Sequence, residues 1–129
     1  MDQATLNSLR LKDQKALKTL LTALNGAQNS LRRDECGDPT IQGSRGTIQS
    51  VNGKFHVYIP SVSAMAWTWA KKQLVTFATP HQDGDAEGIL ILMRMPDRGE
   101  AKTLRHLIGL RQTVSVPPYR AQSLKKHAH

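Results

Sequence analysis

The dipeptide Asn52-Gly53 constrains the fold of this chain more than any other feature, because it joins two stretches with the alternating pattern of β-strands. Both residues tolerate the positive φ angles of a type I′ turn, so they predict a hairpin with a two-residue loop. A loop of that length fixes the pairing, with Val51 opposite Lys54 and each earlier residue opposite a later one. The hairpin register therefore follows from the turn.

This register gives the hairpin a core face and a polar face. The core face carries Ile48, Phe55, Val57 and Ile59. The polar face carries cations, an amide that can bind base edges, and an aromatic ring for stacking, at Arg45, Gln49, Lys54, His56 and Tyr58. A two-stranded ribbon is also narrow enough to enter the DNA major groove. We predict nucleic-acid binding on this face; the alternative is the ordinary solvent-exposed face of a half-covered sheet.

A long first helix is predicted from about residue 12 to residue 33. Leucines and alanines recur there at spacings of three and four, which is the stripe of an amphipathic helix. Leu17, Leu24 and Leu31 also have heptad spacing, so a homodimer seam along this helix is a second interpretation.

Two further helices and one more strand follow the hairpin. After Pro60, Ser61 or Ser63 can cap a helix that runs to about Phe77. The apolar run at 89–93 predicts a strand buried on both faces. Asp97 and Glu100 have the spacing of a capping box and begin a third helix.

The element order is thus α-β-β-α-β-α, an α+β domain in which three helices pack on a small antiparallel or mixed sheet. We expect one domain over residues 1–112. Residues 113–129 contain adjacent prolines and no periodicity, so we expect a flexible basic tail there.

The positive charge lies at the two ends of the chain. The formal net charge is +8; residues 1–33 carry six basic and two acidic side chains, residues 34–88 four and six, and residues 89–129 eight and two. Basic surfaces attract polyanions, and DNA and RNA are the commonest of these in cells. Arg98, Lys102 and Arg105 line one side of the third helix and could contact phosphates, continued by Arg111 and by Arg120, Lys125 and Lys126 in the tail. The alternative is a solvated helix face.

The segment at 81–88, HQDGDAEG, is the one candidate cation site. Asp83, Asp85 and Glu87 alternate as in the first half of a calcium-binding loop, and His81 precedes them. The position that should supply the closing glutamate is Arg94, a cation. We therefore interpret this segment as a polar connection between a helix and a strand, with these three acids as weak metal candidates only.

Catalysis and cofactor binding have no support in the sequence. No phosphate-binding glycine loop, zinc spacing or nucleophile elbow occurs. The single cysteine, Cys36, stands among acidic residues, which disfavour a thiolate. We expect no enzyme, no cofactor, no membrane span and a cytoplasmic location.

Three hypotheses of function follow. The first is a small basic protein that binds DNA or RNA, or regulates, through the hairpin face with the third helix and tail. The second is an adaptor or inhibitor that binds a protein partner through the long helix and an outward-facing Trp69. The third is a cation-binding protein.

Overall fold

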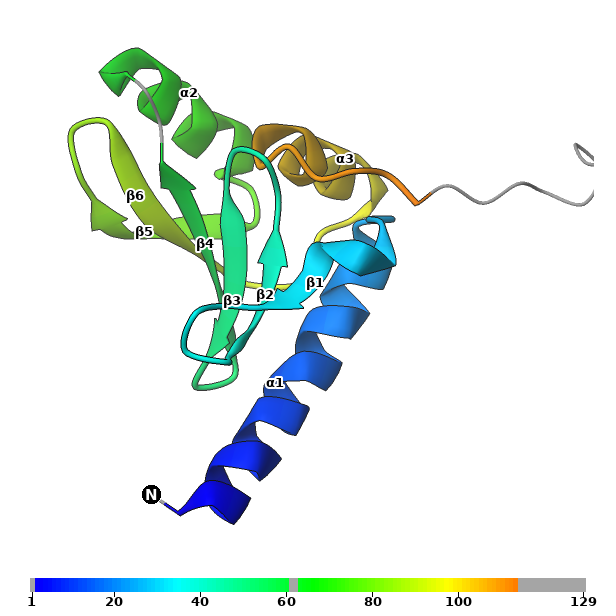
Figure 1. Ribbon diagram of the computed structural model, residues 1–129. Helices are drawn as coiled ribbons and strands as arrows, with labels where there is room; N and C mark the ends of the chain where they lie inside the picture. Colours follow the sequence, from blue (N-terminus) through cyan, green and yellow to red (C-terminus); the bar gives the residue numbers. More distant parts are fainter. Residues whose placement is uncertain (1, 61–62, 114–129) are drawn as a thin grey trace, which may run out of the picture.

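Six antiparallel strands form the sheet of this protein, in the order β1-β2-β3-β4-β6-β5. The computed structural model describes residues 2–60 and 63–113 (Figure 1). The helices are α1 (Gln3–Ala23), α2 (Ala64–Leu74), α3 (Arg98–Leu107) and the 3-10 turn η1 (Gln28–Ser30). The strands are β1 (Leu31–Arg33), β2 (Pro39–Gln42), β3 (Thr47–Val51), β4 (Lys54–Pro60), β5 (Ala78–Asp83) and β6 (Glu87–Leu92). The α+β class is as predicted.

The hairpin β3–β4 has the predicted register. Val51 pairs with Lys54, and the pairing continues to Thr47 opposite Tyr58. Asn52 and Gly53 have φ angles of 51° and 79°, as a type I′ turn requires. The prediction is confirmed because turn length alone determines which residues face each other.

One face of the sheet is covered by all three helices. Ile41, Ile48, Val57 and Leu90 are neighbours across β2, β3, β4 and β6, and each is at most 1% exposed. They form a single apolar cluster with side chains from every helix, among them Leu17, Leu20, Trp67, Ala70, Ala101 and Leu104. The opposite face of these strands has no described helix on it.

The predicted bounds of the first helix were wrong. The helix begins earlier, with Asp2 accepting a hydrogen bond from the Thr5 amide (2.7 Å), and it ends at Ala23. Asn25 adopts a φ of 54°, and a side chain on Gly26 would collide with Leu21 and Leu110. The apolar spacing continues after Ala23 because Leu31, in β1, packs against the same core as the leucines of α1.

The homodimer seam expected along the first helix does not exist as an exposed surface. Leu17 and Leu24 are fully buried in the chain's own core. Leu31 lies in β1, where it pairs with Ile41 and packs against the same core. Leu17 and Leu24 therefore stabilise the core of the chain itself and present no surface to a second copy, while Leu31 is partly buried against the same core.

The sequence patterns did not predict β1 or β5, and they joined β2 to β3 as one strand. Residues 81–88 are not a helix-to-strand connection, because they form the end of β5, a tight turn and the start of β6. Pro80 is tolerated in β5 because this strand lies at the edge of the sheet. Strand β6 is not buried on both faces: Leu90 and Leu92 face the core, whereas Ile89 and Ile91 are only half-buried.

The caps of the other helices are as predicted from residue type. Ser63 accepts a hydrogen bond from the Ala66 amide (3.1 Å) at the start of α2. Asp97 and Glu100 form the expected capping box of α3. Ser61 lies outside the described residues.

The chain after α3 returns to the end of α1. The Thr113 amide donates to the carbonyl oxygen of Asn25 (2.8 Å), and Gln112 forms a bridge with Gly26. The tail predicted beyond this point lies, from residue 114 on, outside the described residues. Within residues 2–60 and 63–113, no helix is long and apolar enough to cross a membrane.

Candidate nucleic-acid interface

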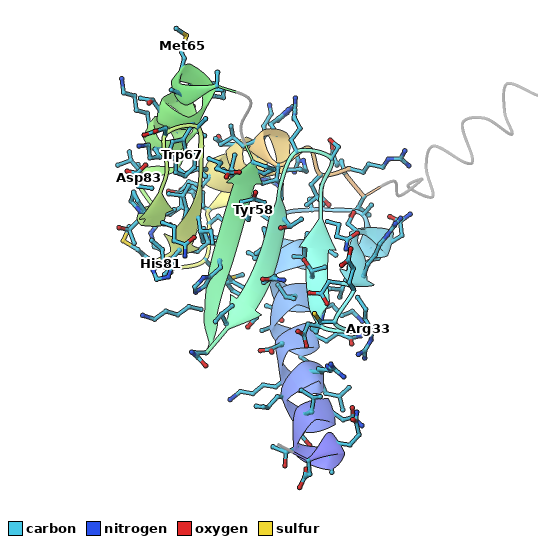
Figure 2. The ribbon with its side chains drawn as sticks, turned by 60° about the vertical axis from the view of Figure 1, so that its left-hand side comes forward. Arg33, Tyr58, Met65, Trp67, His81 and Asp83 are labelled. Atoms are coloured by element: carbon cyan, nitrogen blue, oxygen red, sulfur yellow. The ribbon has the colours of Figure 1, made fainter. Side chains whose placement is uncertain are left out.

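The uncovered face of the sheet, here called the open face, carries two rows of side chains that run across the strands. Strand pairing defines the first row as Gln49, His56, Ile91 and Thr79. It defines the second row as Gln42, Thr47, Tyr58, Ile89 and Gln82. The sheet stands in front of α1 in Figure 2, with Tyr58 near its centre. The polar face predicted for the hairpin is thus the middle of a wider surface.

Tyr58 is the most prominent aromatic side chain of the open face, with 38% of its surface exposed. Its hydroxyl donates a hydrogen bond to Oε2 of Glu87 (2.9 Å). That hydrogen bond, which favours the protonated phenol, raises the pKa of Tyr58 above its ordinary value. Glu87 therefore holds the Tyr58 ring in place, and its carboxylate puts a negative charge beside the ring.

A pair of histidines lies next to Tyr58 on the open face. His56 and His81 meet edge to face, with their ring centroids 5.2 Å apart. Partial burial lowers the pKa of His56 below its ordinary value, and the charges of His81 and Lys54 act in the same direction. His56 is consequently mostly neutral at pH 7, and its ring adds a flat surface more than a charge.

Two exposed cations also belong to the open face, one on β4 and one on β1. Lys54 begins β4 and is exposed. Arg32, in β1, is also exposed and has its Nε bonded to the carbonyl oxygen of Asn29 (3.0 Å). Gln49 is exposed between them and donates to Asp34 (3.3 Å). The open face thus presents flat rings, an amide and two cations.

The structure does not bring all predicted binding residues together. Helix α3 buries Ala101 and Leu104 in the core, so it lies on the helix-covered side of the sheet. Lys102 lies on that helix, as do Arg98 and Arg105, while Arg111 follows it and Arg45 approaches its end from the β2–β3 loop. These residues and the open face are therefore on different sides of the sheet.

Two of the predicted binding residues, Arg105 and Arg45, hydrogen-bond to backbone carbonyls at the ends of helices. The Arg105 guanidinium donates to the carbonyl oxygen of Leu24 (2.8 Å), which satisfies a carbonyl at the end of α1. Arg45 donates from Nη2 to the carbonyl oxygen of His106 (2.6 Å), at the end of α3. Sequence spacing placed both on a solvated face, whereas each closes a helix terminus.

The acids of residues 81–88 have separate partners. Asp83 accepts hydrogen bonds from Nε1 of Trp67 (2.7 Å) and Nζ of Lys71 (2.8 Å), which lower the pKa of its carboxyl. Glu87 accepts from Tyr58, and Asp85 is exposed in the turn. Among the described residues no group of three or more histidines, cysteines or acids could hold a metal ion.

Sequence reasoning missed His81, Ile89, Ile91 and Arg32 as parts of the open face. Each belongs to a strand that was unrecognised or whose exposure was misjudged. The one available signal was the apolar run Ile89, Leu90, Ile91 and Leu92. Successive side chains of a strand point to opposite faces, but because all four residues are apolar the run does not reveal which face is open.

Comparisons with protein-family models, with curated proteins and with solved structures found no match for this chain. The class that the structure defines is an α+β protein whose antiparallel sheet is covered by helices on one side and, within residues 2–60 and 63–113, by no helix on the other.

Proposed function

We propose that this protein binds single-stranded nucleic acid, RNA or DNA, on the open face of its sheet. The observation that carries the proposal is the grouping of Tyr58 with the His56–His81 pair on a face that also carries the exposed cations Lys54 and Arg32. Rings provide sequence-tolerant stacking for unpaired bases, and the flanking cations neutralise phosphates.

The width of the sheet favours a single strand over a duplex. Strands are spaced by about 4.8 Å, so six of them span about 24 Å from first to last. The DNA major groove is only about 12 Å wide. β2 and β6 flank the hairpin on both sides, so it is not the free two-stranded ribbon that entry into the major groove requires.

The spacing of the rings suits consecutive unpaired bases. His56 and Tyr58 are two residues apart on β4 and share the open face. Two residues of strand correspond to about 6.8 Å. An extended single strand could therefore place one base on Tyr58 and its neighbour on the histidine pair.

The charge of the chain supports the same assignment. The formal net charge of +8 gives a long-range attraction for any polyanion. Glu87 and Asp34 are the acids that contact open-face side chains, and both are already hydrogen-bonded, to Tyr58 and Gln49.

A second function is supported by the exposed N-terminal half of α1. This end of the helix projects beyond the sheet (Figure 1), and Leu9 and Leu11 are 44% and 57% exposed. An exposed helix end that carries apolar side chains can dock in a groove of a partner protein. Loss of partner capture in Leu9→Glu and Leu11→Glu variants, with unchanged nucleic-acid affinity, would support this adaptor role.

The test of the proposed function is the salt dependence of oligonucleotide binding, measured by fluorescence anisotropy with single strands of about 12 nucleotides. Each phosphate neutralised contributes about 0.7 to the slope of log K against log salt for a single strand. We expect Lys54→Gln and Arg32→Gln each to reduce the slope by about 0.7. The matched control is Lys72→Gln, an exposed lysine of α2 on the helix-covered side, which should leave the slope unchanged.

Equal slopes in all three variants would refute the open face as the binding surface. Tighter binding of a duplex than of either single strand would refute the single-strand assignment.

A further inference from the structure

A hollow of about 740 Å³ lies on the other side of the molecule, between α2, α3, the end of β4 and the β2–β3 loop. This size falls within the range of small-molecule sites, which is about 300 to 1,000 Å³. None of the open-face residues lines it. It is therefore a feature separate from the candidate nucleic-acid interface.

The walls of the hollow are mainly apolar. Ile59, Ala70 and Leu107 contribute aliphatic surface, and Trp69 stands at its margin with 55% of its surface exposed. Trp67, two residues earlier, is 1% exposed and belongs to the core. The helix thus presents one tryptophan to the core and the other to the hollow.

The ionisable side chains of the lining are all basic, beside the neutral polar Ser44, Gln73 and Thr103. Arg45, Lys102 and His106 all line the hollow, and no aspartate or glutamate does so among the described residues. The side chain of Lys102 has neither a hydrogen bond nor an ion pair with any residue in 2–60 and 63–113. Basic groups collected around an apolar surface without acidic partners attract an anion.

Arg45 is held in a defined position at this site. Its amide donates to the carbonyl oxygen of Ile108 (2.9 Å), and its Nη2 donates to that of His106 (2.6 Å). Because only Nη2 of the guanidinium donates to a residue that the structure describes, the other N–H groups can donate to a carboxylate in a planar arrangement of two parallel hydrogen bonds.

We infer that this hollow binds an organic carboxylic acid with an apolar body, its carboxylate held by Arg45 and Lys102 and its body packed against Trp69. Charge complementarity selects this occupant. The sequence beyond residue 113 is basic, with Arg120, Lys125 and Lys126, so it would be repelled from the same corner. The inference does not depend on the proposed function, since no open-face residue takes part.

The experiment is isothermal titration of the full chain with two acids, decanoate and 2-naphthoate, and with 1-decanol as the neutral counterpart of decanoate. At least one acid should bind with one-to-one stoichiometry and raise the melting temperature, and decanol should bind at least about tenfold more weakly than decanoate. Binding should also change the emission of the exposed Trp69, an effect that Trp69→Phe removes.

Lys102→Glu should weaken the acid by about tenfold or more, and Lys102→Gln by less. Arg98→Glu is the matched control, because Arg98 is an exposed cation of α3 that does not line the hollow. It should leave the affinity within about twofold. Circular dichroism of each variant verifies the fold.

Three results would overturn the inference. They are the absence of saturable binding by both acids, equal binding of decanol and decanoate, and equal weakening by Lys102→Glu and Arg98→Glu. Capture of an acidic amphipathic peptide in place of both acids would also overturn it, since the occupant would then be a protein.

Discussion

Removal of the Tyr58 ring is the substitution that separates stacking from charge on the open face. Replacing a stacking aromatic residue by alanine weakens single-strand binding by about five- to 150-fold. Only 38% of Tyr58 is exposed, so a base can cover one part of the ring, and we expect a loss near the lower end, about five- to 20-fold. Because the side chain carries no charge, the salt slope should not change.

Fluorescence anisotropy at two or more salt concentrations measures both quantities. Tyr58→Phe is the matched control, since it keeps the ring and loses only the hydrogen bond to Glu87 (2.9 Å), and its affinity should stay within about twofold of the parent. The stacking argument is refuted if Tyr58→Ala binds as tightly as the parent, or if Tyr58→Phe loses as much affinity as Tyr58→Ala.

Three further predictions concern pH and the turn. Since the pKa of His56 is lowered in the fold, the unfolded chain binds more protons below pH 6.5, and stability should decline as pH falls through this region. His56→Gln should lessen that decline in thermal melts at pH 7.5 to 5.5, and an unchanged profile would contradict it. Hydrogen bonds from Arg94, the Asp97 amide and Thr76 lower the pKa of Glu100 to about 2, so its stabilising effect is present above pH 4.5 and lost toward pH 2. Glu100→Gln should therefore lower the melting temperature at pH 7 but very little at pH 2, whereas an equal loss at both would exclude an ionic cause. Asn52→Ala, at φ 51°, should cost about 1 kcal/mol in urea unfolding, and no loss would mean that the turn is not strained by the new side chain.

Local sequence rules were sufficient where a few adjacent residues determine the geometry. The Asn52-Gly53 turn gave the register of β3 and β4 because its length admits one pairing. Asp97 and Glu100 gave the start of α3 because a capping box involves only neighbours in the chain.

Apolar periodicity gave the wrong end for the first helix, because a later strand buries its residues in the same core. Leu31 continues the spacing of the α1 leucines, but it reaches the core from β1 after the chain has turned at Asn25. Apolar spacing reports which residues are buried and does not report whether one element carries them all.

The candidate site could be predicted only in its centre. Gln49, His56 and Tyr58 follow from the hairpin register, whereas His81 reaches the open face from β5, an edge strand with little strand character in its sequence. Nothing in the helical spacing of Arg105 distinguishes a phosphate contact from its observed bond to the Leu24 carbonyl, because that partner is distant in sequence.

Amide chemical-shift mapping with a single-stranded oligonucleotide tests the central proposal most directly. If the open face binds nucleic acid, the shifts should concentrate in β3, β4 and β6, around Tyr58, and spare the residues of α1. Shifts confined to α2, α3 or residues 114–129, or the absence of shifts at low salt, would contradict the proposal.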